Sequence, residues 1–206
     1  MRTTTPLRRA LITLTATAAV ALTATGSAVA VPVSGTAPAP HATAVSLSPL
    51  HPVVELAAER LATADLVAAA KWGTDSPIDD PAREQQVLDN VAAQAQQLGA
   101  DPDEIRTIFR DQIEANKVVQ RGLFQRWTDH PDEAPTTKPD LTVVRRQINQ
   151  ITSALVQALA DTSENRDTFA CRPELALAAF HVHHENHLDA LHTHALIRAL
   201  PSICRD

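Results

Sequence analysis

Residues 101–127 constrain the fold more than any other stretch of the chain. Apolar residues recur along it at the spacing of one face of an α-helix. Three uncharged amides, Gln112, Asn116 and Gln120, lie on that same face. A buried amide without partners costs about 1 to 3 kcal/mol. The pattern therefore predicts either a polar cavity or a network of amides that bridges helices.

Helical periodicity and helix-stop residues predict five helices in all. The expected spans are 53–71, 81–98, 102–127, 141–159 and 173–200. Asp80-Pro81 and Asp101-Pro102 are helix-start signals, and Glu104 is expected to complete a capping box at the second of them. The prolines of residues 128–140 indicate a connector.

Strand periodicity is not seen anywhere in the sequence. Five Gly, four Phe and no Tyr leave little material for a sheet, whereas the Ala, Leu and Gln content favours helices. We therefore predict an all-α fold. Residues 50–206 are expected to form a single domain, because about 155 residues are an ordinary size for one domain.

The beginning of the chain has the features of an export signal. Three arginines precede a short run of small and apolar residues, and Ala28-Val29-Ala30 is an A-x-A cleavage signal. We expect residues 1–30 to be a signal peptide and residues 31–49 to be a flexible lead-in. The protein is then secreted or periplasmic. No membrane association is expected after cleavage, because no other stretch reaches about 18 apolar residues.

The net charge narrows the possible binding partners. Cleavage after Ala30 would remove three arginines and no acid, which lowers the formal charge from −6 to −9. Such an acidic chain is not expected to bind nucleic acid.

Cys171 and Cys204 are the only two cysteines. In an exported protein they are expected to form a disulfide, worth about 3.5 to 4 kcal/mol in the chain-entropy model.

Four cationic residues lie at positions that suggest a shared anionic ligand. Arg60 and Lys71 are three helical turns apart and border the apolar stripe of the first helix. Arg83 is in the first turn of the second helix, where the dipole disfavours a cation, so a compensating anion is expected. Arg145 flanks the apolar stripe of the fourth helix. Taken alone, Arg60 could form a salt bridge and Lys71 could interact with the helix dipole.

Together these residues resemble the all-α AroQ-type chorismate mutases. The resemblance rests on the following residues and motifs: Arg60, Lys71 twelve residues before Arg83, Asp80-Pro-Ala-Arg83-Glu84, and Asp111-Gln-Ile-Glu-Ala-Asn116-Lys-Val-Val-Gln120. The signal peptide, the Pro-rich connector before Arg145 and the cysteine pair resemble the exported gamma subclass. The resemblance covers residues of about 53–206, with catalytic helices at about 53–160 and disulfide-closed C-terminal helices at about 161–206.

The resemblance implies a Claisen rearrangement of chorismate to prephenate without a cofactor. It also implies a homodimer in which each site lies inside one protomer. Chorismate carries two carboxylates and a hydroxyl, and its breaking C–O bond places partial negative charge on the ether oxygen. A catalyst therefore needs cations, a donor at the ether oxygen and a tight enclosure.

Roles follow from the resemblance for eight residues. Arg60, Lys71 and Gln120 are the expected catalytic residues, and the full substrate-binding set is Arg60, Lys71, Asp80, Arg83, Glu84, Asn116, Gln120 and Arg145. The arginines would bind carboxylates, and Lys71 and Gln120 would donate to the ether oxygen. Asp80 and Glu84 would lie near the substrate hydroxyl and Asn116 near a carboxylate, although Asp80 could equally be a plain N-cap.

This sequence departs from some family members at two positions. Some members have a hydroxyl residue where this chain has Asn116, and some exported members have Glu where it has Gln120. Arg146 directly follows Arg145, and only the length of the connector favours Arg145 as the inward residue.

A histidine-rich segment, residues 181–194, suggests a different function. His183 and His187 are spaced i, i+4 and could hold a transition metal with Glu185 or Asp189. No third ligand at tetrahedral spacing is evident, so no metal site is predicted. The alternatives to an enzyme are an exported metal-binding module and a helical interaction protein that has the same fold without turnover.

Overall fold

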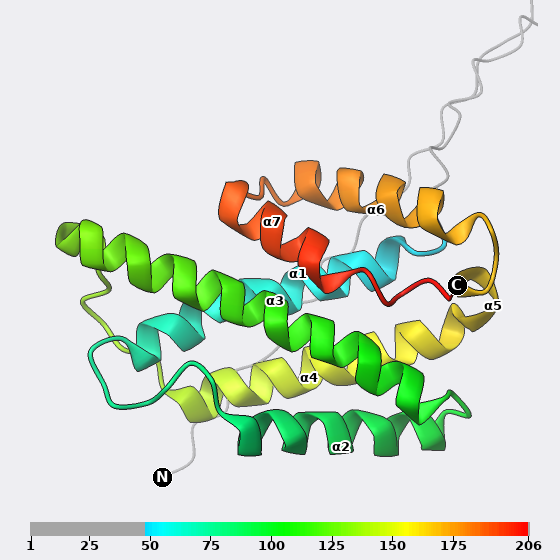
Figure 1. Ribbon diagram of the computed structural model, residues 1–206, viewed down its shortest axis with the longest axis horizontal. Coiled ribbons are helices and arrows are strands. Elements are labelled where there is room, and N and C mark those ends of the chain that lie inside the picture. Colours follow the sequence, from blue (N-terminus) through cyan, green and yellow to red (C-terminus); the bar gives the residue numbers. More distant parts are fainter. Residues whose placement is uncertain (1–47, 206) are drawn as a thin grey trace, which may run out of the picture. The chain divides into compact units, whose positions relative to one another are not determined.

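The computed structural model describes residues 48–205, and all regular structure in that range is helical (Figure 1). The elements are α1 (His51–Lys71), α2 (Pro81–Gln97), α3 (Pro102–Asp129), the 3-10 helix η1 (Pro131–Glu133), α4 (Leu141–Asp161), α5 (Ser163–Arg166), α6 (Cys171–Glu185) and α7 (Ala190–Ala199). The prediction of an all-α class is confirmed. The expected signal peptide and most of the lead-in lie outside the described residues. None of the described helices has the length and apolar character that a membrane span requires.

Helix α1 lies in the middle of the described helices and contacts α3, α4, α6 and α7. Helix α2 packs mainly against α3 and α4, on the side away from α6 and α7 (Figure 1). The apolar stripes of these helices form one core, which includes Val54, Ile105, Phe109 and Leu155. The arrangement brings α1, α2, α3 and α4 around a common interior.

Aspartate N-caps start α2, α3 and α4. Asp80 accepts a hydrogen bond from the Arg83 backbone N–H (3.0 Å), and Asp101 accepts one from the Asp103 N–H (2.8 Å). The capping box expected at Glu104 is wrong. Its carboxylate binds Arg166 and Arg205 instead of the Asp101 N–H. The fully buried Arg166 needs a counter-charge more than the exposed end of α3 needs a second cap.

The single helix expected over residues 173–200 is also wrong, because the chain turns between α6 and α7. His187 has φ of 49° and follows the end of α6. The His187 N–H donates to the His184 carbonyl (3.4 Å), and the Leu188 N–H donates to the His183 carbonyl (3.1 Å). These two bonds form a Schellman motif. Asp189 then caps α7 by accepting from the His192 N–H (2.8 Å). The four-residue α5 was not predicted.

The C-terminal segment is tied down covalently and by charge. The Cys171–Cys204 disulfide is present, with a Cα–Cα distance of 5.8 Å, which confirms the predicted bridge. Next to it, the Arg166 guanidinium donates to the carbonyls of Leu159 (3.2 Å) and Ile203 (3.1 Å) and pairs with Glu104. The segment after α7 is therefore held against the start of α3 and the end of α4.

Candidate active site

A cavity of about 200 Å³ lies between α1, α2, α3 and α4. The loop between α1 and α2 contributes Ser76, Pro77 and Ile78 to its wall. All eight residues that carry a role by resemblance line this cavity: Arg60, Lys71, Asp80, Arg83, Glu84, Asn116, Gln120 and Arg145. The structure thus brings together residues from four helices. Their roles toward a substrate stay a prediction.

Arg60 is a buried cation whose side chain is held by neutral groups. Its side chain is anchored by the Gln112 carbonyl (3.1 Å from Nη1) and the Thr152 hydroxyl (3.4 Å from Nε), and its guanidinium lies 5.6 Å from the Phe109 ring centroid. Within the described part of the chain, no carboxylate pairs with it. Burial away from water lowers the pKa of Arg60 to about 10. An anion entering the cavity would restore the lost charge compensation.

Lys71 is the last residue of α1 and projects into the cavity from the side of the α1–α2 loop. Its Nζ donates to the carbonyls of Pro77 (2.7 Å) and Ile78 (3.4 Å). Desolvation lowers the pKa of Lys71, and the charge of Arg145 lowers it further, while Asp80 acts in the opposite direction. An ammonium group has three N–H donors, so one is left for a ligand.

An aromatic cluster fixes the end of α1 against α3. Trp72, which directly follows Lys71, packs edge-on against Phe124 and Trp127, with ring centroids 5.1 Å and 5.4 Å away. Edge-to-face packing of this kind has a specific geometry. The cluster therefore holds the backbone from which Lys71 extends.

Arg83 and Arg145 complete the cationic wall. Arg83 donates to the Gln86 side chain (3.2 Å). The compensating anion expected beside it is not found among residues 48–205, because Glu84 pairs with Lys117 instead. Arg145 lines the cavity, whereas Arg146 is not among the lining residues. This placement agrees with the choice of Arg145 as the inward residue.

One of the three amides of α3 bridges helices, and the other two line the polar cavity, so both alternatives predicted from the sequence occur. Gln112 donates to the Ala199 carbonyl (3.0 Å) and so bridges α3 to the end of α7. Asn116 and Gln120 line the cavity, and Gln120 Nε2 donates to Asn116 Oδ1 (2.7 Å). Gln120 Oε1 is buried, and no group of residues 48–205 pairs with it. A polar cavity and a bridging amide thus occur on the same helix.

Lys117 is a cavity residue that the sequence reasoning missed. Its Nζ pairs with Glu84 (3.3 Å), Glu114 (2.5 Å) and Asp79 (3.3 Å). Desolvation by itself would lower the pKa of Lys117, but the hydrogen bonds to these three carboxylates outweigh it and raise the pKa. Lys117 lies off the apolar stripe of α3, so helical periodicity gave no signal for it.

Relatives of known activity share most of this chain. Residues 52–121 match the family described as "Chorismate mutase type II". A protein of Mycolicibacterium smegmatis named "Secreted chorismate mutase" is 39% identical over 165 residues, which are 80% of this chain and 91% of the relative. A protein of the same name from Mycobacterium tuberculosis is 33% identical and aligns over 80% of this chain and 82% of its own length. The chain belongs to the chorismate mutase family.

Solved structures agree with this assignment. The crystal structure of a chorismate mutase from Burkholderia phymatum superimposes with a TM-score of 0.73 at 37% sequence identity. It covers 77% of this chain and 98% of its own length. The chorismate mutase fold therefore includes nearly all of the described helices, and not only the matched segment 52–121.

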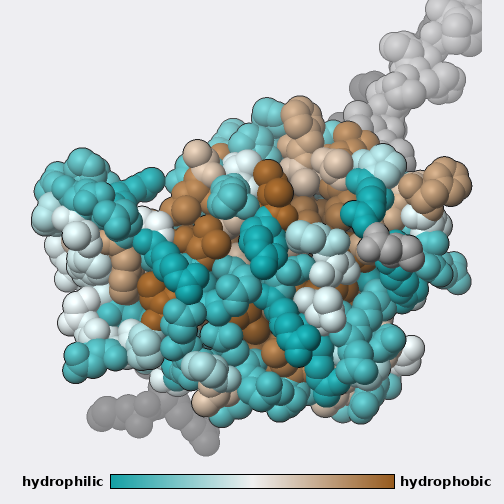
Figure 2. Space-filling view, viewed as in Figure 1, coloured by the Kyte–Doolittle hydropathy of each residue, from teal (hydrophilic) through white to brown (hydrophobic). Residues whose placement is uncertain are grey.

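A larger cavity of about 460 Å³ lies between α6 and α7 of this chorismate mutase. Most of its lining is apolar and includes Leu175, Phe180, Leu196 and Ile197. Hydrophobic side chains also gather on the surface over α6 and α7 (Figure 2). This cavity lacks the converging cations that a dianion such as chorismate needs, and it is not the candidate active site.

Proposed function

We propose that this secreted chorismate mutase converts chorismate to prephenate in the cavity between α1, α2, α3 and α4. The single observation that carries the assignment is Arg60, which is 5% exposed and has no carboxylate partner within residues 48–205. Five cationic side chains line the cavity against two carboxylates: Arg60, Lys71, Arg83, Lys117 and Arg145 against Asp80 and Glu84. Such an excess of positive charge favours a dianionic substrate.

Arg60, Arg83 and Arg145 are the proposed carboxylate-binding residues. Guanidinium groups bind carboxylates with two parallel donors, which fixes orientation as well as position. Because these arginines come from three different helices, they can hold two carboxylates in the compact conformation that the rearrangement requires. Binding in that conformation converts binding energy into rate.

Lys71 and Gln120 are the proposed donors to the ether oxygen. Rotating the Asn116 and Gln120 amides together reverses the bond between them, so that Asn116 Nδ2 donates to Gln120 Oε1. The Oε1 that has no partner among residues 48–205 is then satisfied, and both N–H groups of Gln120 Nε2 become available to a ligand of the cavity that Gln120 lines. Both donors would act on charge that appears only in the transition state.

The remaining polar residues would position the substrate rather than react with it. Asp80 is an N-cap of α2 and also lines the cavity, so its two proposed roles are compatible. Glu84 lies beside Asp80, and its Oε1 accepts from the Asp80 N–H (3.4 Å). Lys117 compensates the charge of Glu84. A hydroxyl of the substrate could donate to either carboxylate without an unfavourable excess of negative charge in the cavity.

The homodimer implied by the resemblance is also a proposal. All eight proposed site residues lie in one chain, which supports a site that needs no residue from a partner. Light scattering coupled to size-exclusion chromatography should give twice the mass of the mature chain. A monomer with full activity would contradict the dimer and leave the proposed site intact.

A matched pair of neighbouring arginines tests the site directly. Arg145→Ala should lower kcat/KM for chorismate about 10- to 150-fold, the equivalent of about 1.5 to 3 kcal/mol for a lost bond to a charged group. Arg146→Ala removes the same charge one residue away, outside the cavity lining, and should change kcat/KM less than about twofold. Chorismate loss is followed by its ultraviolet absorbance. Equal effects of the two substitutions would contradict the proposed site.

A further inference from the structure

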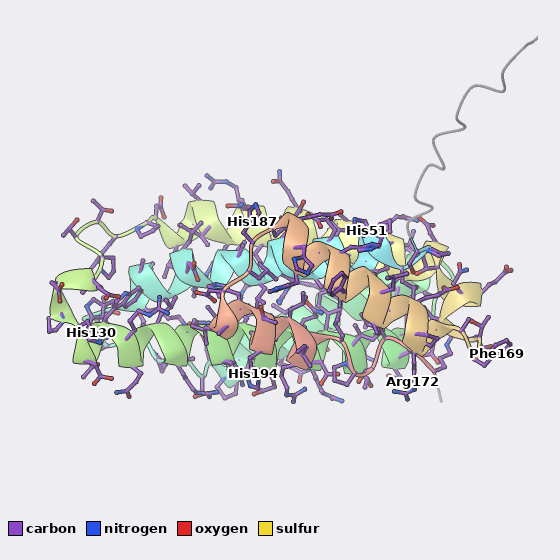
Figure 3. The ribbon with its side chains drawn as sticks, turned by 90° about the horizontal axis from the view of Figure 1, so that it is seen from above. His51, His130, Phe169, Arg172, His187 and His194 are labelled. Carbon is purple, nitrogen blue, oxygen red and sulfur yellow. A yellow bond between two sulfur atoms is a disulfide. The ribbon has the colours of Figure 1, made fainter. Side chains whose placement is uncertain are left out.

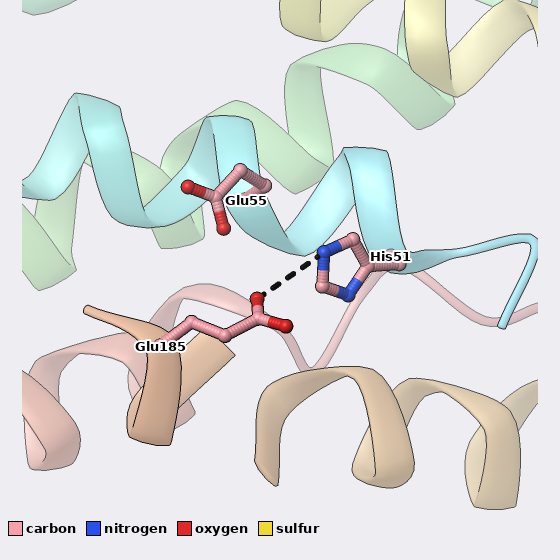
Figure 4. A group of neighbouring side chains, drawn as sticks. All are labelled: His51, Glu55 and Glu185. Atoms are coloured by element: carbon pink, nitrogen blue, oxygen red, sulfur yellow. Dashed lines mark ion pairs between the residues drawn. The ribbon is translucent and has the colours of Figure 1, made fainter. Parts of the chain in front are cut away.

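A second group of ligand-type side chains lies at the beginning of α1, at the other end of the helix from Lys71 (Figure 3). It consists of His51, Glu55 and Glu185, each of which offers one ligand atom (Figure 4). These three atoms all lie within 4.8 Å of one another. None of the three residues lines the substrate cavity. The group therefore has no part in the site described above.

The local structure explains why these three side chains meet. His51 and Glu55 are spaced i, i+4 on α1 and so lie on one face of it. Glu185 is the last residue of α6, which packs against α1. The Schellman turn that ends α6 directly after Glu185 fixes where its carboxylate emerges.

The distance between His51 and Glu185 suits a shared metal ion better than a direct hydrogen bond. His51 Nε2 lies 3.4 Å from Glu185 Oε2. Hydrogen bonds between nitrogen and oxygen are usually about 2.7 to 3.2 Å long. Two ligand atoms, each bonded at about 2.0 to 2.1 Å to a tetrahedral Zn²⁺, are about 3.3 to 3.4 Å apart.

The surroundings orient Glu55 and favour positive charge. Asn186 Nδ2 donates to both oxygens of Glu55, at 3.3 Å and 3.2 Å, as outer-shell partners of metal-binding carboxylates do. Two carboxylates lie beside the C-terminal end of α6, which carries partial negative charge. One imidazole does not compensate this charge, whereas a divalent cation would.

The geometry points to a site for a divalent first-row transition ion, with Zn²⁺ as the representative, formed by His51 Nε2 and the carboxylates of Glu55 and Glu185. One nitrogen and two oxygen ligands suit zinc and its neighbours in the series and leave a fourth position for water. The ion would join the first turn of α1 to the last turn of α6. Its role is to stabilise the fold, since the ligands lie outside the substrate cavity.

Zinc binding and thermal unfolding test the site together. The mature enzyme is treated with chelator, dialysed and titrated with ZnCl₂ in a calorimeter, with melting temperatures measured in parallel. We expect one tight site per chain. Zinc at about 100 times Kd should raise the folded-to-unfolded ratio about 100-fold, or the melting temperature by roughly 5 to 10 °C. A wild-type melting temperature that does not respond to zinc would overturn the site.

Single substitutions separate this site from adventitious binding by other histidines. Glu185→Gln keeps the shape of the side chain, which is half exposed, and should weaken the tight site at least tenfold and abolish the zinc-dependent shift. His51→Ala should do the same. His194→Ala removes an exposed histidine of α7 that lies apart from His51 and should change neither result (Figure 3). Tight binding that survives in Glu185→Gln but is lost in His194→Ala would refute the assignment.

Activity measurements test the stabilising role of the ion. The chelated enzyme should keep its kcat for chorismate at a temperature well below its melting point, because no cavity residue is a ligand. Loss of kcat on chelation, with recovery on adding zinc, would refute a purely stabilising ion. The metal ligands would still be tested by Glu185→Gln and His51→Ala, and the substrate cavity by Arg145→Ala.

Discussion

Arg60 and Arg166 are both buried, but only Arg166 has a carboxylate partner within residues 48–205. Arg166 is 0% exposed and pairs with Glu104, and two backbone carbonyls accept from its guanidinium. Arg60 is 5% exposed and has one carbonyl and one hydroxyl as acceptors, with no carboxylate within residues 48–205. The first charge is compensated inside the protein. The second is left for a ligand.

This difference separates residues that stabilise the fold from residues that serve the reaction. An ion pair that is broken inside a protein leaves a buried charge and costs stability. A buried cation that has only neutral partners already carries part of that cost, and burial accordingly lowers the pKa of Arg60. Removing Arg60 should therefore harm activity and not stability, and removing the partner of Arg166 should do the reverse.

The largest expected effect is on activity, from Arg60→Met. Methionine keeps much of the volume of the side chain and removes its charge. We expect kcat/KM for chorismate to fall about 10³-fold, or roughly 4 kcal/mol of transition-state stabilisation. The melting temperature should stay the same or rise. If Arg60→Met has the kcat/KM of the wild type, Arg60 does not serve the reaction, and the proposed difference from Arg166 is wrong.

The next effect is on stability, from Glu104→Gln. The buried Arg166 and the neighbouring Arg205 would lose their shared carboxylate. Unfolding by denaturant should show a loss of about 3 kcal/mol, while kcat per folded molecule is unchanged. Glu133→Gln, on the exposed η1, serves as the control and should change stability by less than about 0.5 kcal/mol. Equal stability of the two variants would show that Arg166 does not depend on its partner.

The pH dependence of Gln120 variants tests whether Gln120, like Arg60, serves the reaction rather than the stability of the fold. Gln120→Ala should lower kcat about 10²- to 10³-fold at every pH, because a preorganised donor is lost. Gln120→Glu can donate only while its carboxyl is protonated, so it should be active in acid and lose activity as the pH rises past the carboxyl pKa. Turnover is measured against pH for the wild type and both variants. A Glu variant whose activity does not depend on pH would remove Gln120 from the mechanism.

The smallest effect concerns His192, a half-buried cation that joins α7 to α1. Its Nε2 lies 3.0 Å from Asp65 and its Nδ1 lies 2.8 Å from Asp189. The hydrogen bond to Asp65, and after it the one to Asp189, raise the pKa of His192 to about 9 against desolvation. The stabilisation is thus complete below pH 6.5, the ordinary value, and is lost as the pH rises through about 9.

Melting temperatures measure this loss. Loss of the His192 proton should lower the melting temperature of the wild type by about 2 to 4 °C between pH 6.5 and pH 9.5. A partly exposed ion pair contributes about 1 kcal/mol at most. His192→Gln should lose that part of the pH dependence and keep its activity. If the pH dependence of the variant equals that of the wild type, the two ion pairs do not contribute to stability.

The helices themselves follow from local interactions, and the sequence by itself determined them. Apolar periodicity marked each long helix, and the Asp-Pro pairs at 80–81 and 101–102 set where two of them begin. The same regularity concealed the turn at residues 186–189, because apolar residues keep their spacing on both sides of it. The cysteine pair was also predictable, because two cysteines in an exported chain allow only one bridge.

The partners of individual polar side chains were decided only by tertiary structure. Gln112 and Gln120 look alike on the stripe of α3, but one meets the Ala199 carbonyl and the other faces the cavity. The sequence predicted that Glu104 completes a capping box, but in the folded protein its carboxylate pairs with Arg166. Periodicity fixes the face of a helix on which a side chain lies. What that face meets depends on residues that are distant in sequence, and the free energy of a buried polar group depends on that partner.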